Sequence, residues 1–164
     1  MFILSINRFD DFSAKALCDF INDKLYPEIF SVLESIDMHI FELMMEKNSQ
    51  LNDIVNCNFQ IVSKEIKMLF SKYEVLMFPR LISMDNSTIS LTPIIDNHKR
   101  VYKIFKKIRH LLDDYEIQAT WSLKQKKCIN ELYVLEQSVL YVLYLKENFL
   151  LAEIKNTSRN EIAR

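Results

Sequence analysis

Residues 17–43 read LCDFINDKLYPEIFSVLESIDMHIFEL, and this stretch decides the fold class. Its apolar residues recur at steps of three and four, which places them on one face of a helix. Ser13 precedes the pattern and can cap the first turn. Because Pro27 lies inside the pattern, we expect the helix to kink or split near Tyr26.

Two further stretches predict helices of similar length. Residues 51–77 repeat the helical period, and we expect Pro79 to end that helix. We expect a third helix over residues 92–115, where Thr92 can cap the first turn and Pro93 suits its start.

The fourth predicted helix contains an uninterrupted apolar stretch. It is expected over residues 120–155, with Thr120 or Ser122 as its cap. Residues 139–145 are apolar or aromatic at every position. Either neighbouring helices cover this stretch on several sides, or a second subunit does.

Four long helices with short links predict an all-α chain folded as an antiparallel up-down four-helix bundle. At 164 residues the chain suits one domain with one core. We therefore expect a single domain over residues 1–164, with an N-terminal arm at 1–12. Residues 156–164 are expected to form a tail or the start of a linker.

The composition favours a helical domain over several other classes. Hydrophobic residues make up 49% and charged residues 26%, which is typical of a folded globular chain. The absence of glycine argues against a phosphate-binding loop or a β-sandwich, because both need its backbone freedom. A net charge of −1 gives no general attraction to nucleic acid or membrane, so neither is expected as a partner.

The cysteines indicate the compartment. Cys18, Cys57 and Cys128 are far apart and odd in number, which does not suit a disulfide framework or a zinc knuckle. We interpret them as reduced, mostly buried thiols. No apolar run approaches the length of a membrane span. A soluble, cytoplasmic protein is therefore expected.

Several short motifs follow one another in a recognisable order. Residues 72–79, KYEVLMFP, close a helix, and a loop then leads to PIIDNH at residues 93–98. The opening LCDFINDKLY at residues 17–26 and the closing LKENFLL at residues 145–151 complete the set. Together they resemble the hemerythrin-like (HHE) domain, most closely its di-iron branch that repairs iron–sulfur clusters. The resemblance covers nearly the whole chain and implies a hemerythrin-like bundle.

The family binds two irons with five histidines and two bridging carboxylates, and the resemblance places these ligands on the sequence. His98 matches one ligand, and His39 would match another after a deletion of about two helical turns near Pro27. The other former ligand positions hold Leu25, Leu69, Tyr73, Val142 and Lys146. The resemblance thus implies a degenerate metal site with His39 and His98 as vestigial ligands. A single-metal site completed by Glu74 or Glu147 is the alternative.

Four residues are expected near the former site: Tyr73, Tyr141, Tyr144 and Lys146. They could bind a small anion or carry a proton, but the favoured interpretation is that they fill the vacated space and hydrogen-bond to one another. No nucleophile, base and orienting group are recognisable together, so the chain is not expected to be an enzyme.

The leading functional prediction is a non-catalytic binding or sensory module without a cofactor. It would act through a protein partner or a dimer formed by the fourth helix. The first alternative is an iron-binding protein of oxygen or nitric oxide response or cluster repair. The second is the sensor domain of a transcriptional regulator, suggested by SRNEIA at residues 158–163. A basic stripe at residues 99–109 could contact phosphates, but a solvated helix face is the favoured interpretation.

Overall fold

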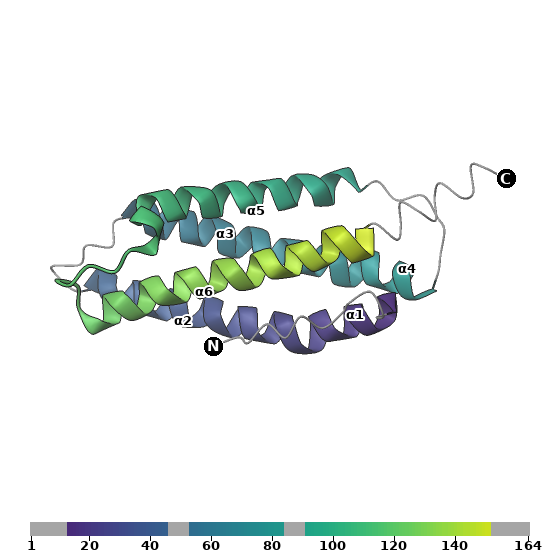
Figure 1. The fold of residues 1–164 in the computed structure, drawn as a ribbon, viewed down its shortest axis with the longest axis horizontal. Coiled ribbons are helices and arrows are strands. Elements are labelled where there is room, and N and C mark those ends of the chain that lie inside the picture. Colours follow the sequence, from purple (N-terminus) through teal and green to yellow (C-terminus); the bar gives the residue numbers. More distant parts are fainter. Residues whose placement is uncertain (1–12, 46–52, 84–90, 152–164) are drawn as a thin grey trace.

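The computed structural model describes residues 13–45, 53–83 and 91–151, and the regular structure in those ranges is entirely helical (Figure 1). The all-α prediction is therefore confirmed for these residues. The helical structure consists of four rods, and each rod is made of consecutive helical segments. The first two rods are α1 (Ala14–Phe20), η2 (Ile21–Leu25) and α2 (Tyr26–Met45), then α3 (Asp53–Lys72), η3 (Tyr73–Met77) and α4 (Phe78–Ser83). The last two are α5 (Thr92–Leu111) with the short turn η4 (Asp113–Tyr115), and α6 (Leu123–Leu145) with η5 (Lys146–Leu150).

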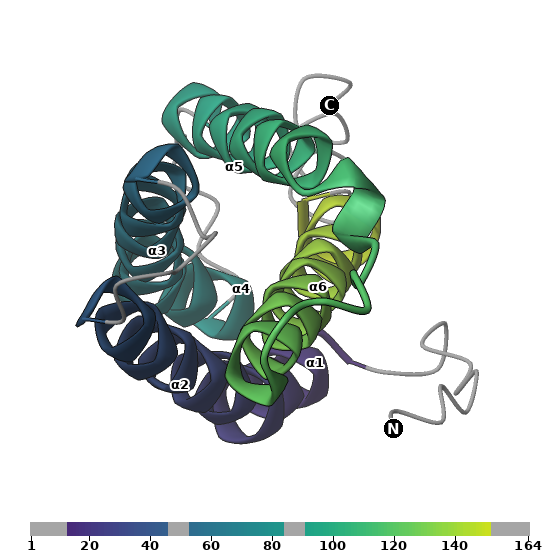
Figure 2. The same ribbon diagram turned by 90° about the vertical axis from the view of Figure 1, so that its left-hand side faces the viewer.

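The rods surround a common interior, in the order α2, α3, α5 and α6 (Figure 2). α3 packs chiefly on α5, and α2 chiefly on α6. Tyr26 at the start of α2 contacts Lys146, whereas His39 further along α2 contacts Glu131 earlier in α6. These two contacts require α2 and α6 to run in opposite directions.

Two serines begin helices as the sequence predicts. The Ser13 hydroxyl accepts a hydrogen bond from the Ala16 amide, which satisfies one of the free donors of the first turn. Ser122, rather than Thr120, caps α6, and it forms a reciprocal capping box with Gln125. The cap expected at Thr92 was wrong, because Thr92 is the first residue of α5 and no side chain caps that helix.

The expectation that Pro79 ends the second helix was also wrong, since α4 continues to Ser83. A π-helical turn, η3, precedes Phe78, and the Phe78 amide bonds to the Tyr73 carbonyl five residues back. Pro79 is then the second residue of α4, where a missing amide hydrogen costs little. Pro27 stands in the same place after η2, so the first helix changes its hydrogen bonding before Tyr26 but is not interrupted.

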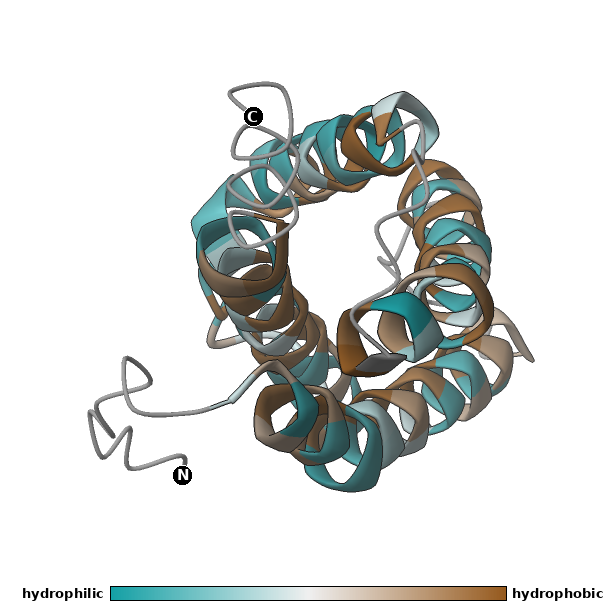
Figure 3. Ribbon diagram, turned by 90° about the vertical axis from the view of Figure 1, so that its right-hand side faces the viewer, coloured by the Kyte–Doolittle hydropathy of each residue, from teal (hydrophilic) through white to brown (hydrophobic). Residues whose placement is uncertain are grey.

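The core lies between the four rods, where the hydrophobic positions of each helix turn toward its neighbours (Figure 3). Residues 139–145 mostly face this core: Val139, Val142, Leu143 and Leu145 are fully buried. Leu140 and Tyr141 are half-buried, and Tyr144 is exposed. Neighbouring helices of the same chain therefore cover most of this apolar stretch.

The link between α5 and α6 turns without glycine. Asp113, Asp114 and Tyr115 have φ of 45°, 57° and 63°, a left-handed conformation that costs about 1–2 kcal/mol per residue. Aspartate tolerates this conformation better than most residues. The buried Tyr115 ring packs edge-on against Tyr133 at 5.7 Å, and this contact helps to hold the turn.

The three cysteines carry free thiols; Cys18 and Cys128 are buried, as expected, and Cys57 is exposed. Among the described helices, none has the length and apolar character needed to cross a membrane. The predicted arm at 1–12, the tail at 156–164 and the regulator-like motif at 158–163 lie outside the described residues.

Candidate functional site

A lysine lies at the centre of the most polar part of the core. Lys146 is the first residue of η5 and is completely buried. Its Nζ donates a hydrogen bond to the Tyr26 hydroxyl at 2.5 Å. The same Nζ lies 3.8 Å from the centre of the Tyr73 ring and 4.5 Å from that of Phe70. The faces of aromatic rings attract a cation, so the rings of Tyr73 and Phe70 form a favourable surrounding for the Lys146 amine.

A second chain of hydrogen bonds adjoins this lysine. The buried His98 imidazole lies between Tyr73, whose hydroxyl is 3.0 Å from Nε2, and Glu147, whose carboxylate is 2.6 Å from Nδ1. Because a carboxylate only accepts, Nδ1 of His98 carries the hydrogen and donates to Glu147. Nε2 then accepts from the Tyr73 hydroxyl. We call Tyr26, Phe70, Tyr73, His98, Lys146 and Glu147 the lysine cluster.

Three π-helical turns position the lysine cluster. Tyr26 directly follows η2, Tyr73 begins η3, and Lys146 and Glu147 begin η5. A π turn holds an extra residue, so it rotates the side chains beyond it relative to a regular helix. In this bundle the three turns lie beside Tyr26, Tyr73 and Lys146, which come from three separate rods and contact one another. Such turns are frequent at functional sites, which marks this end of the bundle as the candidate site.

Burial dominates the electrostatics of Lys146. Loss of water around the amine lowers its pKa well below the ordinary 10.5, while the nearby Glu74 and Cys18 act in the opposite direction. Removing an ammonium from water costs several kcal/mol, of which each aromatic face returns about 2 kcal/mol. The neutral amine is therefore far easier to form here than on a surface lysine.

The neighbouring groups are shifted by burial as well. Burial raises the pKa of both Tyr26 and Tyr73 far above 10, so their phenols stay protonated at neutral pH. Burial also lowers the pKa of His98, a shift that the hydrogen bond from His98 to Glu147 opposes. Glu147 is itself partly exposed, with 39% of its side chain accessible, and connects the cluster to solvent.

This arrangement does not provide a catalytic group with access to a substrate. The amine of Lys146 is a nucleophile when neutral, but no part of the residue is accessible. The Tyr73 phenol cannot act as a base, because burial keeps it protonated. The polar atoms of the cluster bond to one another, which is the role of a structural network that satisfies buried groups.

The two histidines assigned as vestigial ligands lie in different places. His39 is buried and pairs with Glu131 at 2.8 Å, and Glu131 also accepts from Ser35. Glu131 and Glu147 are separated by sixteen positions of the α6–η5 rod, which is roughly 24 Å of helix. The structure therefore does not bring His39 and His98 into one site.

The residues at the mapped ligand positions do not fit a di-iron centre. Leu25, Leu69 and Val142 are buried and have no donor atom, and the Lys146 amine lies at the position that the resemblance assigns to a bridging carboxylate. Across the described residues, no group of three or more His, Cys, Asp or Glu side chains could hold a metal ion. His98 has one carboxylate beside it, Glu147, which was one of the two expected.

The expected group of four residues is brought together only in part. Tyr73 and Lys146 are in contact, but Tyr144 is half exposed and packs edge-on against Phe149 instead. Tyr26 was missed at the sequence level. Its position one residue before Pro27 was the available signal, because a proline inside a helix displaces the hydrogen bonds just before it.

The basic stripe on α5 is partly balanced by acids. Arg109 pairs with the buried Glu136 at 2.7 Å, Arg100 lies 3.4 Å from Glu65, and Lys99 lies 3.7 Å from Asp96. Such pairs suit the favoured interpretation of a solvated helix face.

Comparison with models of protein families found no match, and neither did comparison with curated proteins. The hemerythrin-like resemblance therefore depends on the motifs quoted above.

Proposed function

We propose that this protein is a non-catalytic binding module of the hemerythrin-like kind, cytoplasmic and free of iron. In this proposal the lysine cluster fills the part of the interior where hemerythrin-like proteins hold their metal. The observation that carries the proposal is the completely buried Lys146, hydrogen-bonded to Tyr26 and surrounded by aromatic rings. As an ammonium, Lys146 would repel a metal cation, and in either protonation state it occupies the space together with the surrounding rings.

The arrangement of the rods supports the family part of the proposal. α3 and α5 pack against each other, η3 contacts α5 through Tyr73 and His98, and α5 contacts α6 through Arg109 and Glu136. Together with the pairing of α2 and α6, these contacts suit the antiparallel up-down order of a hemerythrin-like bundle.

The binding function must then use the outside of the bundle. The fourth helix was expected to supply the surface, but most of residues 139–145 pack inside the chain. The exposed apolar residues concentrate instead on α2 and the start of α3, and they include Met38, Phe41, Met44 and Ile54. Exposed apolar patches of this kind mark interaction sites more often than isolated exposed residues do.

Elemental analysis tests the iron-free interior. The wild type, His98→Ala and His110→Ala would be incubated with ferrous iron without oxygen, desalted and analysed. His110 is an exposed histidine on the same helix, so its variant controls for binding at the surface. We expect no iron above background in any of the three samples.

Iron retained by the wild type and by His110→Ala, but lost from His98→Ala, would contradict the proposal. Two irons per chain would indicate the family's di-iron chemistry, and one would indicate a mononuclear site at His98.

A further inference from the structure

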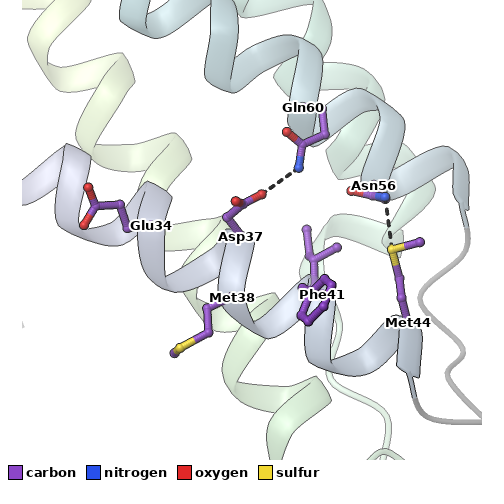
Figure 4. Close-up of a pocket in the computed structure, with 8 residues that line it drawn as sticks. Glu34, Asp37, Met38, Phe41, Met44, Asn56 and Gln60 are labelled. Atoms are coloured by element: carbon purple, nitrogen blue, oxygen red, sulfur yellow. Dashed lines mark hydrogen bonds between the residues drawn. The ribbon is translucent and has the colours of Figure 1, made fainter.

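A groove runs along the outside of the bundle between α2 and α3 (Figure 4). Met38, Phe41 and Met44 of α2 line it, with exposed fractions of 53%, 60% and 53%. Asn56 and Gln60 of α3 line the opposite side. The volume of the groove is about 550 Å³, and Ile40, Glu34 and Asp37 complete its lining. We call this feature the α2/α3 groove.

The apolar surface of α2 extends past the groove. Met45, four residues after Phe41, is 70% exposed. Methionine is flexible and polarizable, so it adapts to different apolar partners and is common on binding surfaces. Apolar side chains that gather on a surface lose contact with water when another molecule covers them, which favours association.

The spacing of the α2 residues suits an α-helix as the occupant. Glu34, Asp37, Phe41 and Met44 follow one another at steps of three or four along α2. From the first to the last the stripe extends over roughly 15 Å, close to three helical turns. An amphipathic helix laid along such a groove contacts it through residues with the same spacing.

The charges on α2 indicate which polar side chains a bound helix would need beside its apolar face. α2 contains the acids Glu28, Glu34, Asp37 and Glu42 and has no lysine or arginine. Within the described residues Glu34 has no ion pair, and Asp37 accepts from Gln60 at 2.7 Å rather than from a cation. Two carboxylates at the edge of the groove therefore have no basic partner among the described residues.

A neutral acceptor in the groove also lacks a partner. Asn56 donates weakly to the Met44 sulfur at 3.3 Å, and its Oδ1 is buried without a hydrogen bond in the described part of the chain. A buried acceptor without a donor is uncommon.

We propose that the α2/α3 groove binds an amphipathic helix of another protein, with lysine or arginine side chains beside its apolar face. Phe41 and Met38 contact the apolar face, and Glu34 and Asp37 pair with the basic side chains. This inference depends on the proposed function only in that both place binding outside the bundle.

A synthetic peptide pair tests the inference directly. The probe is a fluorescent amphipathic helix of leucine and lysine, about 18 residues or five turns long. Its control has the same pattern with glutamate in place of lysine. Fluorescence anisotropy is measured against the full chain. We expect saturable binding of the lysine peptide with a Kd of about 1–100 µM, at least tenfold weaker binding of the glutamate peptide, and weaker binding as salt rises.

Variants assign the binding to the groove. Phe41→Ser should weaken the binding of the lysine peptide by about tenfold or more, because buried aromatic anchors dominate such interfaces. Glu34→Gln combined with Asp37→Asn should weaken it by about threefold and reduce its salt dependence. Val75→Ser is the matched control, since Val75 is 68% exposed but lies on η3, outside the groove. Circular dichroism confirms that each variant is folded.

Three outcomes would overturn the inference. The first is no saturation by the lysine peptide below about 1 mM. The second is equal binding by the wild type and Phe41→Ser. The third is self-association in sedimentation velocity that Phe41→Ser abolishes, which would identify a second copy as the occupant. Iron retention in the earlier experiment would refute the iron-free interior without changing the peptide result, so the two failures are distinguishable.

Discussion

The lysine cluster and the α2/α3 groove are opposite departures from the usual distribution of residues. The cluster buries a lysine, a histidine and two tyrosines, and each of their polar groups has a partner in the chain. The groove exposes methionine and phenylalanine, and its Asn56 oxygen and Glu34 carboxylate have no partner in the described residues. The lysine cluster therefore satisfies its own polar groups, whereas the groove leaves two without a partner in the described residues.

The two regions therefore have different expected roles. A buried polar group is costly unless it is satisfied, so a complete network indicates a structural role. An apolar surface is costly unless it is covered, so an uncovered one indicates a role in binding. Substitutions in the two regions should therefore affect different properties: stability in the cluster and association in the groove.

The largest expected difference is between two aromatic truncations. Tyr73→Ala removes a fully buried ring that contacts Lys146 and a hydroxyl that bonds to His98. We expect it to lower the free energy of unfolding by about 3–5 kcal/mol. Phe41→Ala shortens a residue that is 60% exposed, so it should change the free energy of unfolding by less than about 0.5 kcal/mol. Urea denaturation of both variants measures the two values.

Equal losses in the two variants would remove the distinction between the regions. A large loss for Phe41→Ala alone would mean that the groove is part of the folding core.

A smaller effect of opposite sign is expected from replacing the buried amine. Lys146→Met combined with Tyr26→Phe replaces the hydrogen-bonded pair by apolar groups of similar size. Because exchange of a buried polar pair for well-packed apolar residues is often stabilising, we expect the free energy of unfolding at pH 7 to rise by about 1–3 kcal/mol. The single variant Tyr26→Phe is the control, since it leaves the amine without its acceptor and should be less stable than the wild type.

The same double variant should have a different pH dependence. The pKa of Lys146 is lower in the folded than in the unfolded chain, so the unfolded chain binds more protons. The free energy of unfolding of the wild type therefore rises with pH between the lowered pKa and 10.5, by at most about 1.4 kcal/mol per pH unit. The lowered pKa of His98 adds a rise in the same direction below pH 6.5. From pH 7 to about 9.5 the rise should vanish in the double variant, and its persistence would exclude Lys146 as the cause.

Much of the helical structure could be predicted from the sequence because the apolar period and the capping residues are local signals. Ser13 and Ser122 occupy the predicted caps. Pro79 was misjudged because a proline signal does not reveal the π turn before it. That turn depends on contacts with other helices, which no local pattern records.

The candidate site could be predicted in part. Tyr73, His98 and Lys146 are in one cluster as the mapped positions suggested, whereas His39 pairs with Glu131 elsewhere. The groove was missed, although its signal was present: Met38, Phe41 and Met44 fall between the inward-facing positions of the first helix. Apolar residues on the outer face of a helix can either contact a partner or be isolated on the surface. The structure decides between these, because it places Met38, Phe41 and Met44 in one groove beside α3.

Titration of the Lys146 side chain tests the account most directly. In NMR spectra of the protein labelled with ¹⁵N and ¹³C in lysine, Lys146→Met identifies the signal by its disappearance, and the other lysines give an internal reference. We expect Lys146 to titrate well below 10.5, because its amine is sealed in the core. Titration at or above 10.5 would show a hydrated or charge-paired ammonium, and the interior would then be open to water, ions or metal rather than closed by its own residues.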